Sequence, residues 1–297
     1  MPALFRTPDE RFESLTGYQY DSEFIELDEA RMAFVDVDDG DPVVCVHGMA
    51  TWSYLYRETI PILAEEGRVI APDLIGFGRS DKFADTDEYS LPFYSQSIVR
   101  FVEALDLENV TLVFEDWGGI VALAALPEIA SRIERLVIMN VPMMVNRTGT
   151  LTMTEAFYNT RSFIERDSDV PVGFLVNRGC EVDLEQEVLA GYEAPYPDET
   201  YKTAIRAFPQ LFPTNSDDEG TELLAASRKL LSTWKKPALV LFSHNDPISK
   251  PAGHWFRELI PTAKEQPESW LPGGHFLVED AGEAVGKHVL NFVNRTS

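Results

Sequence analysis

The sequence has little of what marks several large classes of proteins. It has only two cysteines, Cys45 and Cys180, which are too few for a disulfide framework. No apolar run approaches the roughly 18 residues that span a bilayer, and the N-terminus has no apolar stretch typical of a secretory signal. We therefore expect a cytoplasmic protein that does not bind membranes.

Basic residues are also scarce. The 297 residues include 49 acidic and 25 basic side chains, which gives a formal net charge of −24, and only eight of the bases are lysine. Such a surface repels nucleic acid and anionic membranes, so neither is expected as a partner. The acids are spread along the chain, as in halophilic proteins from salt-loaded cytoplasms, where screening relieves self-repulsion. An ordinary acidic enzyme is the alternative.

What is present is a repeating order of strands and helices. Hydrophobic residues make up 44% of the chain, which is enough for a large core in one α/β domain. The order predicts a mostly parallel, doubly wound sheet, with residues 24–27 and 32–37 as antiparallel edge strands. Further strands are predicted at 42–46, 69–71, 110–114, 136–139, 238–242 and 268–271. Helices are predicted at 53–65, 91–105, 120–126, 223–231, 254–259 and 284–293.

This alternation stops in the middle of the chain. Residues 142–215 contain helical stretches, many prolines and glycines, and no good strand. We therefore expect a core domain made of residues 1–141 and 217–297, with a helical cap inserted at 142–216.

One turn carries the central chemical signal. The apolar strand 110–114 leads into Glu115-Asp116-Trp117-Gly118-Gly119, and a helix that Pro127 is expected to end comes next. This is the strand–turn–helix context of a nucleophile elbow, with Asp116 in place of the usual serine. A carboxylate there can attack carbon and form a covalent ester. For an isolated turn of this kind, a helix-capping Asp is the simpler interpretation.

Two later residues favour the catalytic interpretation. His275 follows two glycines after the last predicted strand, and Asp246 follows the strand before it. His275 would activate water against the ester, and Asp246 would orient His275. The order nucleophile, acid, base is that of α/β-hydrolases, and all three residues follow predicted strand ends, where ligands bind in such sheets.

The expected ester also needs donors for its oxyanion. We assign these to the backbone N–H groups of Trp117 and of Met49, which follows His47-Gly48. His47 itself is expected to brace the loop. The indole of Trp117 is a donor without acceptor character and suits a departing anion, although a Trp packed for its area is the alternative.

With these residues in place, the chain resembles the haloalkane dehalogenases of the α/β-hydrolase superfamily over nearly its full length. The resemblance extends from the turn to the N-terminal segment, the loops after the early strands, and the predicted cap. The matching stretches are Arg6 to Phe12, Thr51 to Arg57, Pro72 to Asp81, Asp116 to Gly119, Ala194 to Asp198, Tyr201-Lys202 and Phe208-Pro209.

The resemblance implies a reaction. Asp116 displaces halide from a small apolar halogenated substrate by SN2 attack, Trp117 binds the halide ion, and water activated by His275 hydrolyses the ester to an alcohol. No cofactor or metal is needed. In one branch of the family the catalytic acid stands at the position of Asn140, so the acid here is placed at Asp246, as in the other branch.

The sequence departs from the family at three places. Met49 stands where the family has Asn or Glu, Glu115 stands where it has Gln, and the predicted cap lacks the second halide-binding Trp, whose place Thr160 takes in a loose alignment.

Two alternatives therefore stay open. One is an epoxide hydrolase with the same triad, which would use cap tyrosines to protonate the epoxide. The other is a binding protein of the hydrolase fold with little catalysis. The candidate tyrosines are Tyr158, Tyr192, Tyr196 and Tyr201.

Overall fold

The computed structural model describes residues 2–27, 30–167 and 169–297; Met1, Asp28, Glu29 and Ser168 lie outside it. Its centre is an eight-stranded sheet in the order β10-β9-β8-β7-β4-β5-β3-β2. These strands are β2 (Glu23–Leu27), β3 (Ala30–Val37), β4 (Val43–Val46), β5 (Val69–Pro72), β7 (Val110–Glu115), β8 (Ile133–Met139), β9 (Ala238–Ser243) and β10 (Ser269–Leu271). A separate pair joins β1 (Leu4–Phe5) to β6 (Lys82–Phe83).

The strands pair as the sequence predicts. From β5 through β10 all neighbours are parallel, and β3 is antiparallel to both β5 and β2. Every residue of β4, β5, β7 and β9 is buried, because helices cover both faces of a parallel sheet. Of the two predicted edge strands, only β2 lies at the edge, and β3 lies one place inside it.

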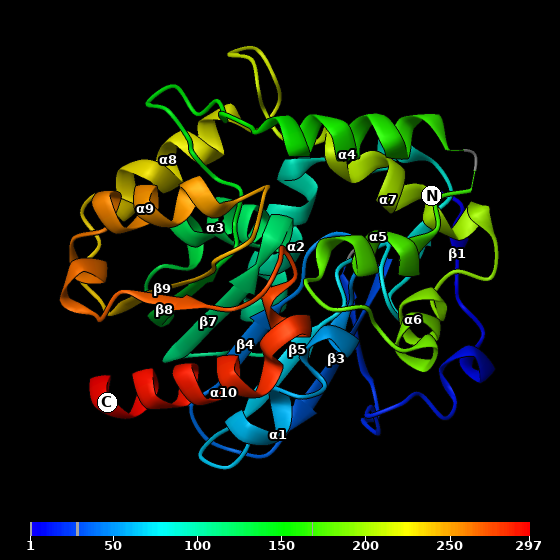
Figure 1. The fold of residues 1–297 in the computed structure, drawn as a ribbon, viewed down its shortest axis with the longest axis horizontal. Coiled ribbons are helices and arrows are strands. Elements are labelled where there is room, and N and C mark those ends of the chain that lie inside the picture. The colour runs from blue at the N-terminus through cyan, green and yellow to red at the C-terminus, as the bar shows by residue number, and fades with distance from the viewer. Residues whose placement is uncertain (1, 28–29, 168) are drawn as a thin grey trace.

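Helices flank the sheet on both sides. Figure 1 shows α10 in front of the strands and α2 and α3 behind them; α1 packs on α10, and α3 packs on α2 and α8. The α-helices are α1 (Ile60–Leu63), α2 (Leu91–Ala104), α3 (Asp116–Ile129), α4 (Glu155–Arg166), α5 (Val172–Gly179), α6 (Gln186–Glu193), α7 (Thr203–Ala207), α8 (Thr221–Leu231), α9 (Lys250–Leu259) and α10 (Leu277–Thr296). The 3₁₀ helices are η1 (Asp9–Phe12), η2 (Ser53–Tyr56), η3 (Thr86–Glu88), η4 (Glu199–Lys202), η5 (Phe208–Gln210) and η6 (Pro261–Glu265).

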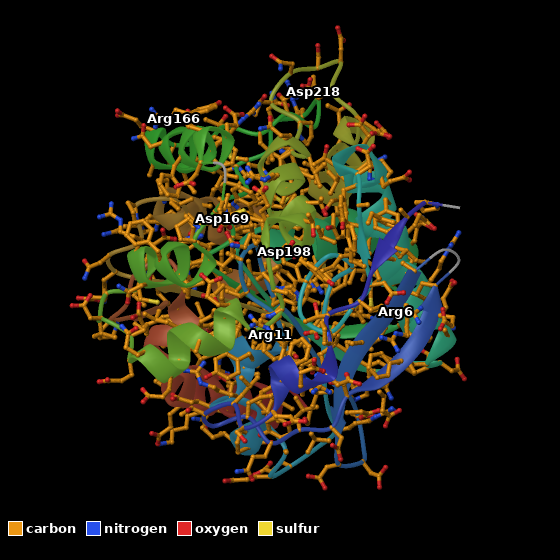
Figure 2. All side chains as sticks on the ribbon, turned by 90° about the vertical axis from the view of Figure 1, so that its right-hand side faces the viewer. Arg6, Arg11, Arg166, Asp169, Asp198 and Asp218 are labelled. Carbon is orange, nitrogen blue, oxygen red and sulfur yellow. The ribbon has the colours of Figure 1, made fainter. Side chains whose placement is uncertain are left out.

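The helices between β8 and α8 gather at one end of the sheet (Figure 1). The N-terminal segment holds this group from the side, where Figure 2 shows Arg11 beside an inserted helix and Arg6 farther along, near the blue strands. The Thr7 hydroxyl donates to the Pro195 carbonyl at 2.6 Å, and Arg11 Nε donates to the Ala194 carbonyl at 3.1 Å. Hydrogen bonds therefore join the stretches Arg6 to Phe12 and Ala194 to Asp198, which both resemble the same family.

Two predicted helices have different bounds in the structure. The stretch 53–65 is not one helix but η2 and then the short α1, with Pro61 in the first turn of α1. Pro127 does not end its helix, because α3 continues to the buried Ile129. The helices of the described ranges include none with the length and hydropathy of a membrane span.

Candidate active site

The predicted elbow is a sharp turn between β7 and α3. Asp116 has φ of 55°, a left-handed conformation that is strained for a residue with a side chain. The loop after β4 comes so close to this turn that a Cβ added to Gly118 would lie 1.8 Å from the His47 carbonyl oxygen. A Cβ on Gly48 would lie 2.3 Å from Asp116 Oδ2. These glycines let the carboxylate of Asp116 stand against the loop after β4.

The three predicted catalytic side chains meet at this turn. His275 Nε2 lies 2.8 Å from Asp116 Oδ1, and His275 Nδ1 lies 3.1 Å from Asp246 Oδ1. The three residues follow β7, β9 and β10, whose carboxyl ends lie at the same edge of the sheet. One imidazole thus joins the candidate nucleophile to a second carboxylate.

Burial and charge act in opposite directions on this group. Burial by itself lowers the pKa of His275, but the charges of Asp246 and Asp116 outweigh it and raise that pKa well above 6.5. Burial raises the pKa of Asp246, yet the charge and hydrogen bond of His275 lower it below 3.8 overall. Asp246 also accepts from the Ile248 N–H at 2.8 Å and from the Ser249 hydroxyl.

The loop after β4 supplies a donor to Asp116. The Met49 backbone N–H donates to Asp116 Oδ2 at 3.0 Å. His47 braces this loop, because its Nδ1 donates to the Gly48 carbonyl at 2.8 Å and its Nε2 accepts from the Leu74 N–H at 2.9 Å. Burial lowers the pKa of His47 to about 4, so its ring is neutral. Both ring nitrogens are occupied, which leaves His47 no role as a base.

The indole of Trp117 carries a buried donor with nothing to receive it. Trp117 is 2% exposed, and within the described part of the chain its Nε1 has no hydrogen-bond partner. The rings of Phe157, Phe208 and Phe212 surround the indole at centroid distances of 5.4, 6.0 and 5.0 Å. A buried donor without a partner costs about 1–3 kcal/mol, a cost that a bound acceptor would relieve.

Asp116, Trp117 and His275 all line one cavity of about 410 Å³. Its wall is mainly apolar and comes from the loops after β4, β9 and β10, from the start of α3, and from α4 and α5. The lining residues are Met49, Ala50, Asp116, Trp117, Ala156, Asn159, Thr160, Phe163, Phe174, Leu175, Arg178, Gly179, Pro247, Ile248, His275 and Phe276.

The four tyrosines of the predicted cap are absent from this lining within the described residues, which disfavours an epoxide hydrolase. Tyr192 instead donates to Glu279, and Tyr158 is 46% exposed. Thr160 does line the cavity, but its hydroxyl donates to the Ala156 carbonyl at 3.1 Å.

Two residues support the site in ways the sequence did not reveal. The Asn140 amide donates to the carbonyls of Gly274 and His275 at 3.0 and 2.8 Å, so it fixes the loop that carries the imidazole. The buried Glu115 accepts from the Val278 N–H at 3.2 Å. Burial raises the pKa of Glu115 well above 4.5. Their only sequence signals were their positions, one after β8 and one before the nucleophile.

Comparison with known proteins places the chain among relatives of similar length. Residues 41–281 match the family described as alpha/beta hydrolase fold. The chain is 38% identical over 300 residues to a haloalkane dehalogenase of Psychrobacter cryohalolentis, with 98% of both chains covered. It is 39% identical over 303 residues to haloalkane dehalogenase 1 of Mycobacterium tuberculosis, with 99% of both covered.

Solved structures agree with these relatives. The fold superposes with a TM-score of 0.88 on the tetrameric structure of haloalkane dehalogenase DpaA from Paraglaciecola agarilytica. The two chains are 31% identical, and the match covers 96% of this chain and 97% of the other.

Proposed function

The chain belongs to the haloalkane dehalogenases, a family with the α/β-hydrolase fold, and we propose that Asp116, His275 and Asp246 are its catalytic triad. The enzyme is a hydrolase that acts on carbon–halogen bonds, with a halogenated substrate and water as reactants. The reaction has two chemical steps, and both take place at the carboxylate of Asp116.

In the first step, a carboxylate oxygen of Asp116 attacks the halogen-bearing carbon. A C–O bond forms as the carbon–halogen bond breaks, and the bonding pair leaves with the halide. The free indole N–H of Trp117, which lines the same cavity, donates to the departing ion. In a dry cavity such a preorganised donor is worth roughly 2–4 kcal/mol of transition-state stabilisation.

In the second step, His275 Nε2 takes a proton from water, and the water oxygen attacks Cγ of the Asp116 ester. The backbone N–H groups of Met49 and Trp117 stabilise the oxyanion; that of Met49 already contacts the carboxylate at 3.0 Å. The ester C–O bond at Cγ then breaks, and His275 returns the proton to the leaving alcohol. Asp246 holds the imidazole and stabilises its cation.

The observation that carries this proposal is the double contact of Asp116 at the cavity wall. One oxygen faces His275 and the other faces the Met49 N–H, so the carboxylate is both oriented and exposed to the cavity. The test is one turnover of a bromoalkane by excess enzyme in ¹⁸O-labelled water. Label should appear in the Asp116 carboxylate and not in the alcohol, whereas label in the alcohol alone would mean direct attack by water.

Three broader assignments complete the proposal. Residues 142–216 act as a helical cap on a core of residues 1–141 and 217–297, supported by the placement of α4–α7 at one end of the sheet. The protein works in the cytoplasm. That cytoplasm is rich in salt, as the net charge of −24 and the scarcity of lysine suggest.

A further inference from the structure

The cavity above Asp116 holds a positive charge that the proposed reaction does not use. Arg178 of α5 lines the cavity together with Asp116 and Trp117. Across the described ranges its guanidinium has no hydrogen bond or ion pair. Arginine presents a planar fork of donors that matches a carboxylate, so a free one in a cavity wall is equipped to bind an anion.

A second polar side chain, that of Asn159, lies in the same cavity wall as Arg178. Helices α4 and α5 run in opposite directions at the same end of the molecule (Figure 1), and the rings of Phe163 on α4 and Phe174 on α5 lie 6.0 Å apart. Asn159 is one turn before Phe163, and Arg178 is one turn after Phe174, so both project from the faces that carry this ring pair. Asn159 also lines the cavity and makes no hydrogen bond within the described residues.

No carboxylate in the described cavity wall is available to the donors of Arg178 and Asn159. Among the described residues that line the cavity, Asp116 is the only carboxylate, and it is occupied by His275 and the Met49 N–H. Phe174, which is 50% exposed, lies one turn from Arg178 on α5. An anion held by Arg178 would therefore sit on the open side of the cavity, where it keeps part of its hydration.

We propose that Arg178 and Asn159 form a subsite that binds a carboxylate at the end of the substrate away from the halogen. The substrates then include halogenated alkanoates as well as neutral haloalkanes. The inference rests on the proposed function, since Asp116 must attack the other end of the same molecule. The net charge of −24 does not prevent this, because molar salt shortens the Debye length to about 3 Å and leaves direct contacts in place.

The test compares a neutral substrate with a carboxylate of equal chain length. Bromide release from 1-bromohexane and 6-bromohexanoate is measured for the wild type, Arg178→Gln, Arg178→Lys and Asn159→Leu, at the lowest KCl concentration at which circular dichroism shows the native fold. The readout is kcat/KM for the carboxylate divided by kcat/KM for the neutral substrate. Arg178→Gln should lower this ratio at least about fivefold, mainly through KM. The ratio for Arg178→Lys should lie between those of the wild type and Arg178→Gln, because lysine keeps the positive charge but lacks the planar fork of donors.

Arg147→Gln is the matched control, since it removes the same charge from an exposed loop residue outside the cavity lining. Its ratio should equal that of the wild type. Hexanoate should also inhibit turnover of 1-bromohexane competitively. Its inhibition constant should be at least about fivefold higher for Arg178→Gln than for the wild type.

A ratio that Arg178→Gln leaves unchanged, or a wild type that rejects 6-bromohexanoate, would overturn the subsite. An equal loss on both substrates would also overturn it, and would place Arg178 on the path of the departing halide. Failure of the wild type to release bromide from 1-bromohexane would instead refute the proposed function.

Discussion

His275 stands between two carboxylates, only one of which would persist through the proposed catalytic cycle. In the free enzyme the charges of Asp246 and Asp116 outweigh burial and raise its pKa well above 6.5, which favours the protonated imidazole. In the proposed ester Asp116 has lost its charge, so the pKa of His275 is expected to fall. That fall favours the neutral imidazole, the form that can take a proton from water, at the stage of the proposed cycle when water has to be activated.

Replacing His275 should stop the cycle at the ester. In His275→Ala the first step remains possible, because the carboxylate of Asp116 attacks without a base, but no group activates water. A bromoalkane should then add its alkyl mass to the peptide that contains Asp116, as measured by mass spectrometry after digestion. His288→Ala, a change at a half-buried residue of α10 outside the cavity lining, is the control and should turn over normally. An unmodified Asp116 peptide in His275→Ala would contradict the assigned base.

The buried Glu115 should make stability depend on pH. Burial raises its pKa in the folded protein, so its contribution is complete below about 4.5 and is lost as the pH rises toward the folded value. Glu115→Gln does not titrate. The Tm of this variant relative to the wild type should therefore increase from pH 5 to pH 8 by about 2 °C or more, measured by calorimetry. A Tm difference that is constant over this range would show that Glu115 does not hold its proton.

The meeting of Asp116, His275 and Asp246 was predictable because each of them has a local signature. Asp116 lies in a strand–turn–helix motif, and His275 and Asp246 follow strand ends in the expected order. Asn140 and Glu115 have no such signature, since their partners at residues 274, 275 and 278 lie more than a hundred positions away. Arg178 and Asn159 became candidates only once the structure placed residues of α4 and α5 in the wall of one cavity.

At the scale of elements, one carboxylate joins three segments that are distant in the chain. Arg57, which lies just after η2, donates from Nη1 and Nη2 to the carboxylate of Glu279 on α10 at 2.7 and 2.6 Å. Glu279 also accepts from the hydroxyl of Tyr192 on α6. The network thus ties an inserted helix to the helix that begins two residues after His275.

Breaking this network should be costly. Glu279→Gln leaves the guanidinium of Arg57 buried without a counter-charge, which should reduce the free energy of unfolding by about 3 kcal/mol. Tyr192→Phe removes one neutral donor and should cost about 1 kcal/mol. Glu283→Gln, on an exposed turn of the same helix, should change nothing measurable. Urea denaturation of the three variants gives these values, and equal effects of Glu279→Gln and Glu283→Gln would rule out the network.

Element bounds were less predictable than element types. Residues 53–65 have helical spacing, but the Ser53 N–H donates to Asp73 at 2.8 Å and the chain turns as η2 before α1. Pro127 removes one helical hydrogen bond, yet α3 continues because packing buries Ile129. Both differences come from contacts with other parts of the fold, which local sequence does not report.

At the scale of the whole molecule, the net charge of −24 is the dominant electrostatic feature. Figure 2 shows charged side chains across one face, including Asp169, Asp198 and Asp218 on or near the inserted helices. Self-repulsion of this charge disfavours the compact state, and salt relieves it.

Stability should therefore rise with salt. Between 0.1 and 2 M KCl we expect the Tm to increase by roughly 10 °C, as screening removes repulsion among the carboxylates. At pH 5 the gain should shrink, since part of the acidic charge is already neutralised. Calorimetry at both pH values checks this, and a Tm that does not respond to KCl would exclude adaptation to a salt-rich cytoplasm.

The amide of Asn140 also limits how this active site can evolve. Its nitrogen donates to the carbonyl oxygens of Gly274 and His275, and its oxygen accepts from the Ser243 N–H at 3.0 Å. An aspartate at this position would place a negatively charged oxygen, in place of the amide nitrogen, against two carbonyl oxygens that cannot donate a hydrogen bond to it. The acid of the proposed triad therefore cannot move from Asp246 to position 140 in a single mutational step; the loop that carries His275 would have to be rebuilt first.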